Sequence, residues 1–412
     1  MTDFKREKGK RIKTWSMDGD EQQNYEGSYE YPVMYRWLGV PPRFEHPYNM
    51  YEDVSSQPKA LRDTINSIKP DVKSIAKEIV DRGINRIIGT GLGTSQFVSQ
   101  AAAGAFWKYA GIDSTDIDSL EYFHNPRPYE YEKICFAVLS GSGSTTDSNR
   151  AGRLAKEMGA FTLAITSVDG SPVTQFCDRK IVCSGGFDTA GGDSFHYTTR
   201  TLALIMLAIE IGKLRQPDKF DYDAISSEIE SIPDRFAKMF DSVDQRCRSI
   251  AKQHNSVRAN IVVGNGSNFG AAEEMSLKFD EMAHLPSKGM VLDRHIHGAL
   301  GLTANNILTI LIVPKNDTGY TEFVNIADFC NTIKSPSIAI VSSDDNEISN
   351  MVDDVIRIPM DTPELFPLLA ILPGQLLPYW SSIYSGYSPD TQRSEVPNYG
   401  RAWGKMFPKG TH

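Results

Sequence analysis

The sequence predicts an α/β protein built from two doubly wound, parallel-sheet domains in tandem. Short apolar runs alternate with helical stretches after Gly83, which implies right-handed crossovers and a parallel sheet covered on both faces. The same rhythm begins again near Asn260, and Ile88–Gly91 is echoed by Val263–Gly266, which indicates an internal duplication. A length of 412 residues leaves room for two or three domains of ordinary size.

The elements of the first domain follow from hydrophobic periodicity. We expect two helices ahead of it, one from Ser56 to a break at Pro70 and one from there to Gly83. A long helix over 196–214 closes the domain. The five strands expected between them are Arg86–Gly89, Leu120–Phe123, Ile134–Leu139, Thr162–Ile165 and Lys180–Cys183.

The second domain is preceded by a charged, helical stretch, Tyr222–Asn255, which is expected to break at Pro233 and to act as a linker. The strands expected beyond it are Asn260–Val263, Ile307–Val313, Ser337–Val341 and Val355–Ile358. The predicted boundaries are an N-terminal extension at 1–55, a first domain at 56–215, a linker at 216–255, a second domain at 256–362 and a C-terminal tail at 363–412.

The composition is that of an ordinary globular protein. Hydrophobic residues make up 40% of the chain and charged residues 23%, and the formal net charge is −9. These values exclude disorder, collagen and coiled coils, and the acidic balance argues against nucleic acid as a partner. Basic residues cluster between Lys5 and Lys13, where a DNA-binding arm is an alternative, but a solvated tail is favoured because no helix-turn-helix periodicity follows.

Neither a membrane nor an oxidising compartment is indicated. The longest apolar region, Phe366–Tyr379, is interrupted by prolines and is too short to cross a bilayer, so we interpret it as buried helix and loop. The N-terminus lacks the apolar stretch of a secretory signal. Five scattered cysteines form no C-x-x-C pair and no zinc spacing, which predicts a cytoplasmic protein without a metal site or cofactor.

A loop rich in hydroxyl groups follows the strand expected at Ile134–Leu139. Ser140, Ser142 and Thr145 are spaced by glycine and serine, and a helical pattern begins directly after them. Small residues let the backbone approach a ligand, hydroxyls donate hydrogen bonds, and a helix N-terminus attracts negative charge, which together suit a phosphate. An N-capped turn with incidental serines is the alternative interpretation.

The glycine turn after the first strand argues against a dinucleotide enzyme. Gly89–Gly93 has the spacing G-x-G-x-G, one residue short of the dinucleotide fingerprint. No acidic residue stands where the ribose would need one. An NAD-dependent enzyme is therefore disfavoured.

Three charged residues share one face of the helix expected after the second glycine turn. Glu274, Lys278 and Glu281 lie at positions i, i+4 and i+7. An exposed ion pair is the simpler interpretation, but a helix that follows a strand-end turn borders the ligand crevice of an α/β sheet. His295 and His297 follow in a short polar loop, so carboxylate, ammonium and imidazole form a candidate acid–base set.

These motifs resemble those of the tandem sugar isomerase (SIS) domain family. The similarity is greatest to the isomerase half of glutamine:fructose-6-phosphate amidotransferase and to free-standing phosphosugar isomerases, deaminases and deglycases, and it covers residues 50–358. Gly93–Ser95 is similar to the family's first glycine turn, Ser140–Thr145 to its phosphate loop, and Glu274–Gly298, without a gap, to its catalytic helix and the segment after it. The resemblance implies two flavodoxin-like SIS domains.

The resemblance also implies a role for each candidate residue. The residues that would hold the sugar phosphate are Ser95, Ser140, Ser142 and Thr145. In the family, the carboxylate matching Glu281 moves a proton between C1 and C2, and the lysine matching Lys278 assists nitrogen chemistry, with Glu274 on the same catalytic helix. The histidine matching His297 opens the sugar ring from across a dimer interface, so a homodimer with shared active sites is implied.

The chain departs from the family's pattern at several positions. It begins Met1-Thr2, without an N-terminal nucleophilic cysteine or a glutaminase domain, so glutamine-driven amide transfer is not expected. Gly141 and Ser144 replace a glutamine and a glutamate of the phosphate loop, and Asp193–Phe195 stands where the family often has Ser-Thr-Lys. The family's C-terminal lysine has only a weak match, Lys405.

We therefore expect an enzyme that acts at C1 and C2 of a hexose 6-phosphate. The reaction would be aldose–ketose isomerisation or amino-sugar deamination through a cis-enediol, which a single carboxylate base can support without a metal. A deglycase of a phosphorylated Amadori compound is the alternative enzyme. A non-catalytic phosphosugar sensor would need the phosphate loop but not the base.

Overall fold

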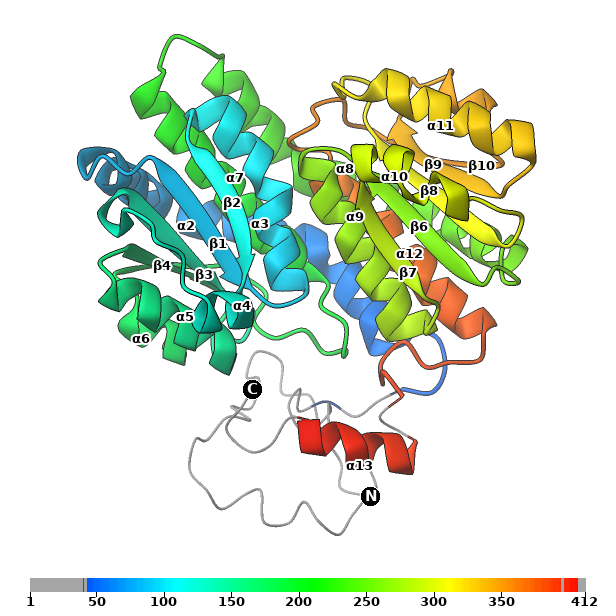
Figure 1. The fold of residues 1–412 in the computed structure, drawn as a ribbon, viewed down its shortest axis with the longest axis horizontal. Helices are drawn as coiled ribbons and strands as arrows, with labels where there is room; N and C mark the ends of the chain where they lie inside the picture. The colour runs from blue at the N-terminus through cyan, green and yellow to red at the C-terminus, as the bar shows by residue number, and fades with distance from the viewer. Residues whose placement is uncertain (1–39, 41–42, 394–395, 407–412) are drawn as a thin grey trace.

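The computed structural model describes residue 40 and residues 43–393 and 396–406. It contains two parallel five-stranded sheets, in the strand orders β2-β1-β3-β4-β5 and β10-β9-β8-β6-β7, each flanked by helices (Figure 1). In both sheets the chain starts near the middle and adds strands outward in two directions, which is the doubly wound arrangement. The predicted fold class is confirmed.

The central strands are apolar on both faces because helices cover both sides of each sheet. Along β3 (Ile134–Leu139), Cys135, Ala137 and Leu139 belong to one core cluster. The alternate residues Ile134, Phe136 and Val138 belong to another on the opposite face. The remaining strands are β1 (Arg86–Gly91), β2 (Asp113–Asp118), β4 (Phe161–Thr166), β5 (Arg179–Val182), β6 (Ala259–Gly264), β7 (Ser287–Val291), β8 (Ile307–Val313), β9 (Ser337–Ser342) and β10 (Asp354–Ile358).

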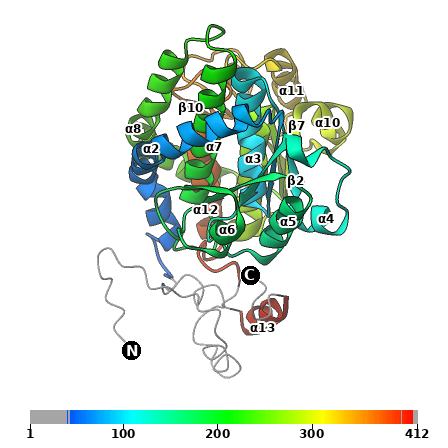
Figure 2. The ribbon, with the colours of Figure 1, turned by 90° about the vertical axis from the view of Figure 1, so that its left-hand side faces the viewer.

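The α-helices cover the faces of the two sheets and connect the two domains. Figure 2 shows α2 crossing α7 on the first domain, in agreement with their contacts. The helices are α2 (Asn49–Asp81), α3 (Thr94–Ala105), α4 (Ser119–His124), α5 (Thr146–Glu157), α6 (Pro172–Phe176), α7 (Phe195–Arg215), α8 (Tyr222–Gln253), α9 (Ser267–Lys278), α10 (Leu292–His297), α11 (Tyr320–Ile333), α12 (Pro367–Tyr384) and α13 (Pro397–Met406). Five-residue π-helices, Phe106–Ala110 and Phe279–Ala283, extend α3 and α9.

Two edge strands differ from the prediction. Leu120–Phe123, expected as a strand, lies in the short helix α4, and the strand is the preceding segment β2, Asp113–Asp118. In the second domain β7 was not predicted at all. Both strands lie at the edge of their sheet, so solvent reaches part of each and their sequences lack the apolar run of a central strand.

Two proline-containing helices, α2 and α8, are continuous where breaks were expected at Pro70 and Pro233. Helix α2 runs through Pro58 and Pro70, and α8 runs through Pro233. Each helix has a continuous buried apolar face, and this packing outweighs the missing backbone hydrogen bond at each proline. Helix α12 likewise continues through two prolines, and it packs against α8 and α9 as part of the core, whereas the sequence predicted a tail from residue 363 onward.

Helices α3 and α9 form the junction between the two sheets, where Figure 1 shows them side by side. A Cβ atom on Gly270 would lie 2.5 Å from the backbone nitrogen of Ala101, and one on Gly104 would lie 2.4 Å from Ser267 Oγ. The helix pair is antiparallel, because the start of α9 lies at the end of α3. The first turn of α3 therefore lies at the last turn of α9.

The internal duplication is present, in a register two residues away from the one the sequence suggested. Gly93 precedes α3 with φ 53° and ψ −125°, and Gly266 precedes α9 with φ 51° and ψ −125°. A positive φ of this kind favours glycine at both turns. The structural equivalence thus pairs Gly91–Thr94 with Gly264–Ser267, and not Ile88–Gly91 with Val263–Gly266.

The remaining sequence expectations concern segments outside the core. The basic cluster Lys5–Lys13 lies outside the described residues. Within residues 43–393 and 396–406, each helix is too short or too polar to cross a bilayer. All five cysteines are free thiols.

Candidate active site

The candidate site lies where the start of α3 meets the end of α9. Thr94 is the first residue of α3, and its Oγ1 accepts a hydrogen bond from Lys278 Nζ at 3.3 Å. Because the last turn of α9 lies beside the first turn of α3, a hydroxyl-bearing turn of the first domain faces a charged turn of the second. The site is thus composed of both halves of the duplication.

Lys278 is at the centre of the charged group on α9. It is fully buried, with Nζ 2.6 Å from Glu281 Oε2 and 3.3 Å from Glu274 Oε1. Burial alone would lower the pKa of this ammonium, but the two carboxylates raise it. The expected surface ion pair between Glu274 and Lys278 is therefore a buried one, and the structure brings all three predicted residues together.

The two glutamates differ in their environment. Burial raises the pKa of Glu274 to about 7, although Lys278 opposes the shift. Burial also raises the pKa of Glu281, against the same opposing charge. Glu281 lies in the π-helix, and 22% of its side chain remains exposed, whereas Glu274 is fully buried. Glu281 is thus the carboxylate that a substrate can reach, and its raised pKa makes it a stronger base than an ordinary glutamate.

The loop Ser140–Thr145 orients its hydroxyl groups as donors. Ser142 Oγ accepts hydrogen bonds from the backbone N–H of Ser144 at 3.2 Å and from Ser144 Oγ at 2.8 Å. Ser140 Oγ accepts from the backbone N–H of Gly143 at 2.9 Å and lies 2.9 Å from Thr145 Oγ1. Ser142, which accepts two hydrogen bonds, keeps its proton for an acceptor such as a phosphate oxygen. Of the Ser140 and Thr145 hydroxyls, one donates to the other and the second keeps its proton.

Arg200, which the sequence analysis did not single out, orients the fourth predicted phosphate ligand. Its guanidinium is fully buried, and Nη1 donates to Ser95 Oγ at 2.7 Å while Nε donates to the His196 carbonyl at 2.7 Å. The Ser95 hydroxyl proton is thereby also free to donate. Arg200 stands among Thr198, Thr199 and Thr201 in α7, so no local pattern in the sequence distinguished it.

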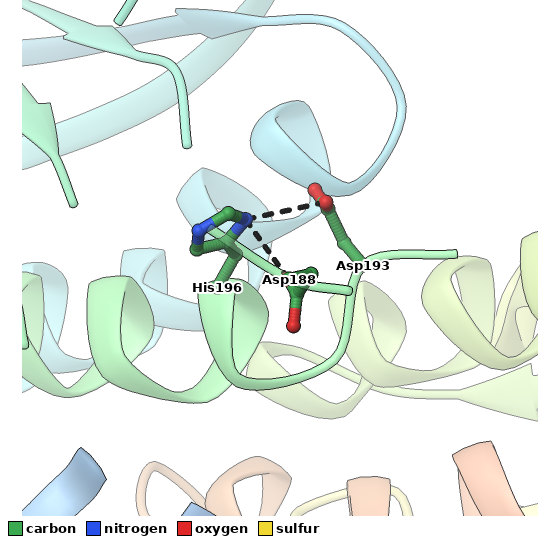
Figure 3. Close-up of side chains that lie close together, drawn as sticks. All are labelled: Asp188, Asp193 and His196. Atoms are coloured by element: carbon green, nitrogen blue, oxygen red, sulfur yellow. Dashed lines mark hydrogen bonds and ion pairs between the residues drawn. The ribbon is translucent and has the colours of Figure 1, made fainter. Parts of the chain in front are cut away.

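The segment Gly186–His196 contributes a second charged cluster to the site. Figure 3 shows the carboxylates of Asp188 and Asp193 turned toward the same ring nitrogen of His196. The distances to Nδ1 are 2.9 Å for Asp188 and 3.3 Å for Asp193. Burial would lower the pKa of His196, but Asp188 and then Asp193 offset this and raise it to about 10.

The same three side chains could also serve as metal ligands, because their ligand atoms lie within 4.8 Å of one another. His196 Nε2 lies 2.6 Å from the Gly186 carbonyl oxygen, which can only accept, so Nε2 carries a proton. A lone pair on Nδ1 would then face two carboxylates. As described, the cluster is an imidazolium held by two anions, and this protonated ring is not a metal ligand.

This segment touches both the phosphate loop and the charged end of α9. A Cβ atom on Gly141 would lie 2.5 Å from His196 Nδ1, and one on Gly192 would lie 3.4 Å from Glu281 Oε2. The segment is fixed from outside as well. Asp53 accepts hydrogen bonds from Thr189 and from the Ala190 backbone, and Gln392 Nε2 donates to the Gly191 carbonyl at 3.0 Å.

The two histidines of the predicted acid–base set are not at this site. They lie on the short helix α10, where a loop was expected. His297 is 76% exposed, with Nε2 3.4 Å from Asp293 Oδ1, and it is not among the described contacts of Lys278 or Glu281. His295 is fully buried, and burial lowers its pKa. Lys405, the weak match to the family's C-terminal lysine, is exposed on α13.

A protein-family model and curated relatives match the chain. The SIS domain model matches residues 82–211. The chain is 26% identical over 351 residues to the glutamine–fructose-6-phosphate aminotransferase of Thermococcus kodakarensis and 29% identical over 354 residues to that of Pyrococcus horikoshii. These alignments cover 85% and 84% of this chain. The chain spans only 57% and 56% of the length of these two relatives.

Solved structures share the fold over most of the chain. The C-terminal domain of glucosamine-fructose-6-phosphate aminotransferase from Francisella tularensis superposes with a TM-score of 0.77 at 21% identity, covering 84% of this chain and 98% of that one. Tagatose-6-phosphate ketose/aldose isomerase from Escherichia coli gives a TM-score of 0.71 at 18% identity, covering 86% and 97%. The chain therefore contains a SIS domain at 82–211, and its two parallel-sheet units have the fold of these tandem SIS-domain structures.

Proposed function

We propose that the protein is an enzyme acting at C1 and C2 of a hexose 6-phosphate, by aldose–ketose isomerisation or amino-sugar deamination. The observation that carries this proposal is the position of Glu281. Its partly exposed carboxylate is bound by Lys278, which also donates to Thr94 at the start of α3. The segment Gly186–His196 contacts both this carboxylate and the phosphate loop. An anion held at one end of a sugar chain would place the carbons at its other end beside this base.

In the proposed isomerisation Glu281 moves one proton. Its carboxylate removes a proton from C1 of the open-chain ketose, the electron pair forms the C1=C2 double bond, and the C2 carbonyl oxygen takes up a proton to give the cis-enediol. Return of the proton from Glu281 to C2, with loss of the O1 proton, gives the aldose. Lys278 holds Glu281 through an ion pair and would assist where the substrate carries nitrogen.

The phosphate would be held by Ser95, Ser140, Ser142 and Thr145. The start of α5 directly follows this loop, so free backbone N–H groups and the positive end of the helix dipole add to the four hydroxyls. This mode of binding needs no broad basic surface, which agrees with the net charge of −9.

Two alternatives use the same phosphate loop. A deglycase would release an amino acid from a phosphorylated Amadori compound, and the acidic groups Asp193 and Glu281 suit a substrate that carries a cationic amine. A sensor would bind a phosphosugar without a base, but the partly exposed Glu281 with its raised pKa favours catalysis.

The test is proton exchange in D2O. The protein is incubated with fructose 6-phosphate, glucose 6-phosphate or glucosamine 6-phosphate, and deuterium uptake at C1 and C2 is followed by proton NMR. Uptake requires a base and supports the enzyme. Binding without uptake for every sugar would support the sensor and overturn the isomerase.

The exposed position of His297 supports a second proposal, that the protein is a homodimer with shared active sites. An exposed imidazole, which in its own subunit pairs with Asp293, is accessible to the site of a partner subunit. In this arrangement His297 would open the sugar ring. We also propose a cytoplasmic location, since all five thiols are free.

A further inference from the structure

We propose that Asp193 is a positioning residue for Lys278. When a phosphate occupies the phosphate loop, Asp193 attracts Lys278 and weakens its ion pair with Glu281. This inference rests on the proposed function, because it assumes that a phosphate binds at Ser140–Thr145. It assigns a role to the charged segment Gly186–His196, which the proposed chemistry leaves unused.

On its phosphate side, the segment offers the cation of His196, and Arg200 follows one turn later in α7. The His196 ring fills the space beside Gly141 in the phosphate loop, and Arg200 binds the hydroxyl of Ser95. Asp193 reaches both cations, but only at long distances, 3.3 Å to His196 Nδ1 and 3.5 Å to Arg200 Nη2. Asp188 holds the same imidazole at 2.9 Å and is almost fully buried. Of the two carboxylates, Asp193 is the one held more loosely.

On its catalytic side, the segment contacts the base and its lysine. A Cβ atom on Gly192 would lie 3.6 Å from Lys278 Cδ and 3.4 Å from Glu281 Oε2. The next residue is Asp193, and 35% of its side chain is exposed. Its negative charge helps to raise the pKa of Lys278. Lys278 Nζ is meanwhile held tightly by Glu281, at 2.6 Å.

These contacts link the two sides by electrostatics. A phosphate dianion bound at Ser140–Thr145 brings negative charge beside His196 and Arg200 and competes with Asp193 for both cations. Asp193 is then available to attract Lys278. When Lys278 moves from Glu281 toward Asp193, the carboxylate of Glu281 loses its counter-charge and becomes a stronger base.

The experiment measures the pKa of Glu281 directly, by 13C NMR of the protein labelled at glutamate carboxyl groups, with Glu281→Gln identifying the resonance. The probe is sorbitol 6-phosphate, which carries the phosphate but no carbonyl group to react. The described charges that act on Glu281 are Lys278, Glu274 and Asp280 from its own helical stretch and Asp193 from the opposite segment. Saturating probe should raise the pKa of Glu281 in the wild type.

Three variants separate the coupling from a general effect of phosphate charge. In Asp193→Asn the rise should shrink to the direct effect of the bound phosphate. Asp193→Glu, which keeps the charge, should restore it. Asp188→Asn alters the other anion of His196 and should keep the rise. Far-ultraviolet circular dichroism verifies that each variant is folded, and binding of sorbitol 6-phosphate is measured separately for each.

The outcomes distinguish this inference from the proposed function. If sorbitol 6-phosphate does not bind the wild type, the proposed phosphosugar site is wrong. If it binds and the pKa of Glu281 rises equally in the wild type and in Asp193→Asn, the coupling through Asp193 is wrong while the site remains. Binding that leaves the pKa of Glu281 unchanged in the wild type would also contradict the coupling.

Discussion

The two halves of the molecule share a backbone plan but not their chemistry. A spacing of 173 positions separates Thr94 from Ser267, the first residues of α3 and α9, and also separates Gly111 from His284, which end the two π-helices with positive φ. The short helices α4 and α10 obey the same spacing. The duplication thus extends through the strand, the long helix and the edge strand of both domains.

The charged side chains of the site have no counterparts at the equivalent positions of the first domain. The positions of Glu274 and Lys278 in α9 are occupied by Ala101 and Ala105 in α3. The position of Glu281 is occupied by Lys108, which pairs with Glu364 at 2.8 Å. By the same spacing, the hydroxyl loop Ser140–Thr145 of the first domain corresponds to Val313–Thr318. There Asp317 accepts a hydrogen bond from Asn265 at 2.8 Å and fills the turn with a carboxylate.

Antiparallel packing of α3 on α9 explains why such divergence yields one site. Each end of the helix pair joins the start of one helix to the end of the other. At one end, hydroxyl donors from the first domain meet Lys278 and Glu281 from the second. At the other end, Ser267 and Gly104 pack closely beside Glu364, whose carboxylate is paired with Lys108. The fold makes the two ends of the α3–α9 pair equivalent in backbone structure, and the side chains present at each end determine which one can act as a catalytic site.

Replacing the base should produce the largest difference between the two ends. Glu281→Gln is expected to reduce deuterium uptake from fructose 6-phosphate by about 10²–10⁴-fold, because an amide cannot take a proton from carbon. The matched control is Lys108→Gln at the equivalent position of the first half, which should keep the wild-type rate. Equal losses in both variants would mean that the difference between the ends does not determine catalysis.

Subunit mixing extends the comparison to the partner chain. Glu281→Gln and His297→Ala are each expected to be inactive dimers. If Glu281 and His297 serve one site from opposite subunits, each mixed dimer has one intact site, and exchange should restore up to about half of its sites. Activity is measured after subunit exchange. No recovery, with both variants folded and dimeric, would show that each site is built within one chain.

How far the sequence predicts this fold depends on burial. Central strands such as β3 and β8 were predicted at their observed bounds, because a strand buried on both faces needs a continuous apolar run. Edge strand β2 has the polar sequence Asp113–Asp118 and carries no such signal. The prolines in α2 and α8 were misleading for a related reason, since long-range packing stabilises these helices and local propensity does not report it.

The part of the site that was predictable from the sequence is the part formed by residues close together in the sequence. Glu274, Lys278 and Glu281 lie on one helix face, so their spacing alone brings them together. Arg200, His196 and Asp193 meet Ser95 and the phosphate loop only through the tertiary fold, and no local pattern indicated them. A buried charge of this kind is recognisable only when its partners are known.

The close contact between the helices can be broken with one methyl group. Gly270→Ala would place a Cβ atom 2.5 Å from the Ala101 backbone nitrogen and 2.6 Å from the Phe97 carbonyl oxygen. We expect a loss of about 1–3 kcal/mol in the free energy of unfolding, as for other overpacked sites. Urea denaturation measures it. Gly301→Ala is the control, since a Cβ atom there has nothing within 4 Å, and equal stability of the two variants would contradict the required close approach.

The smallest expected effect distinguishes the two loops that follow equivalent strands. Thr145 Oγ1 lies 2.9 Å from Ser140 Oγ among oriented donors, whereas its equivalent, Thr318, is exposed beside Asp317. Thr145→Ala should weaken binding of sorbitol 6-phosphate by about 1 kcal/mol, roughly fivefold in Kd, as for one hydrogen bond to a charged group. Thr318→Ala should leave Kd unchanged, because an anion gains nothing beside the Asp317 carboxylate. Isothermal titration calorimetry compares the two variants, and a weaker affinity in Thr318→Ala alone would move the phosphate to the second domain.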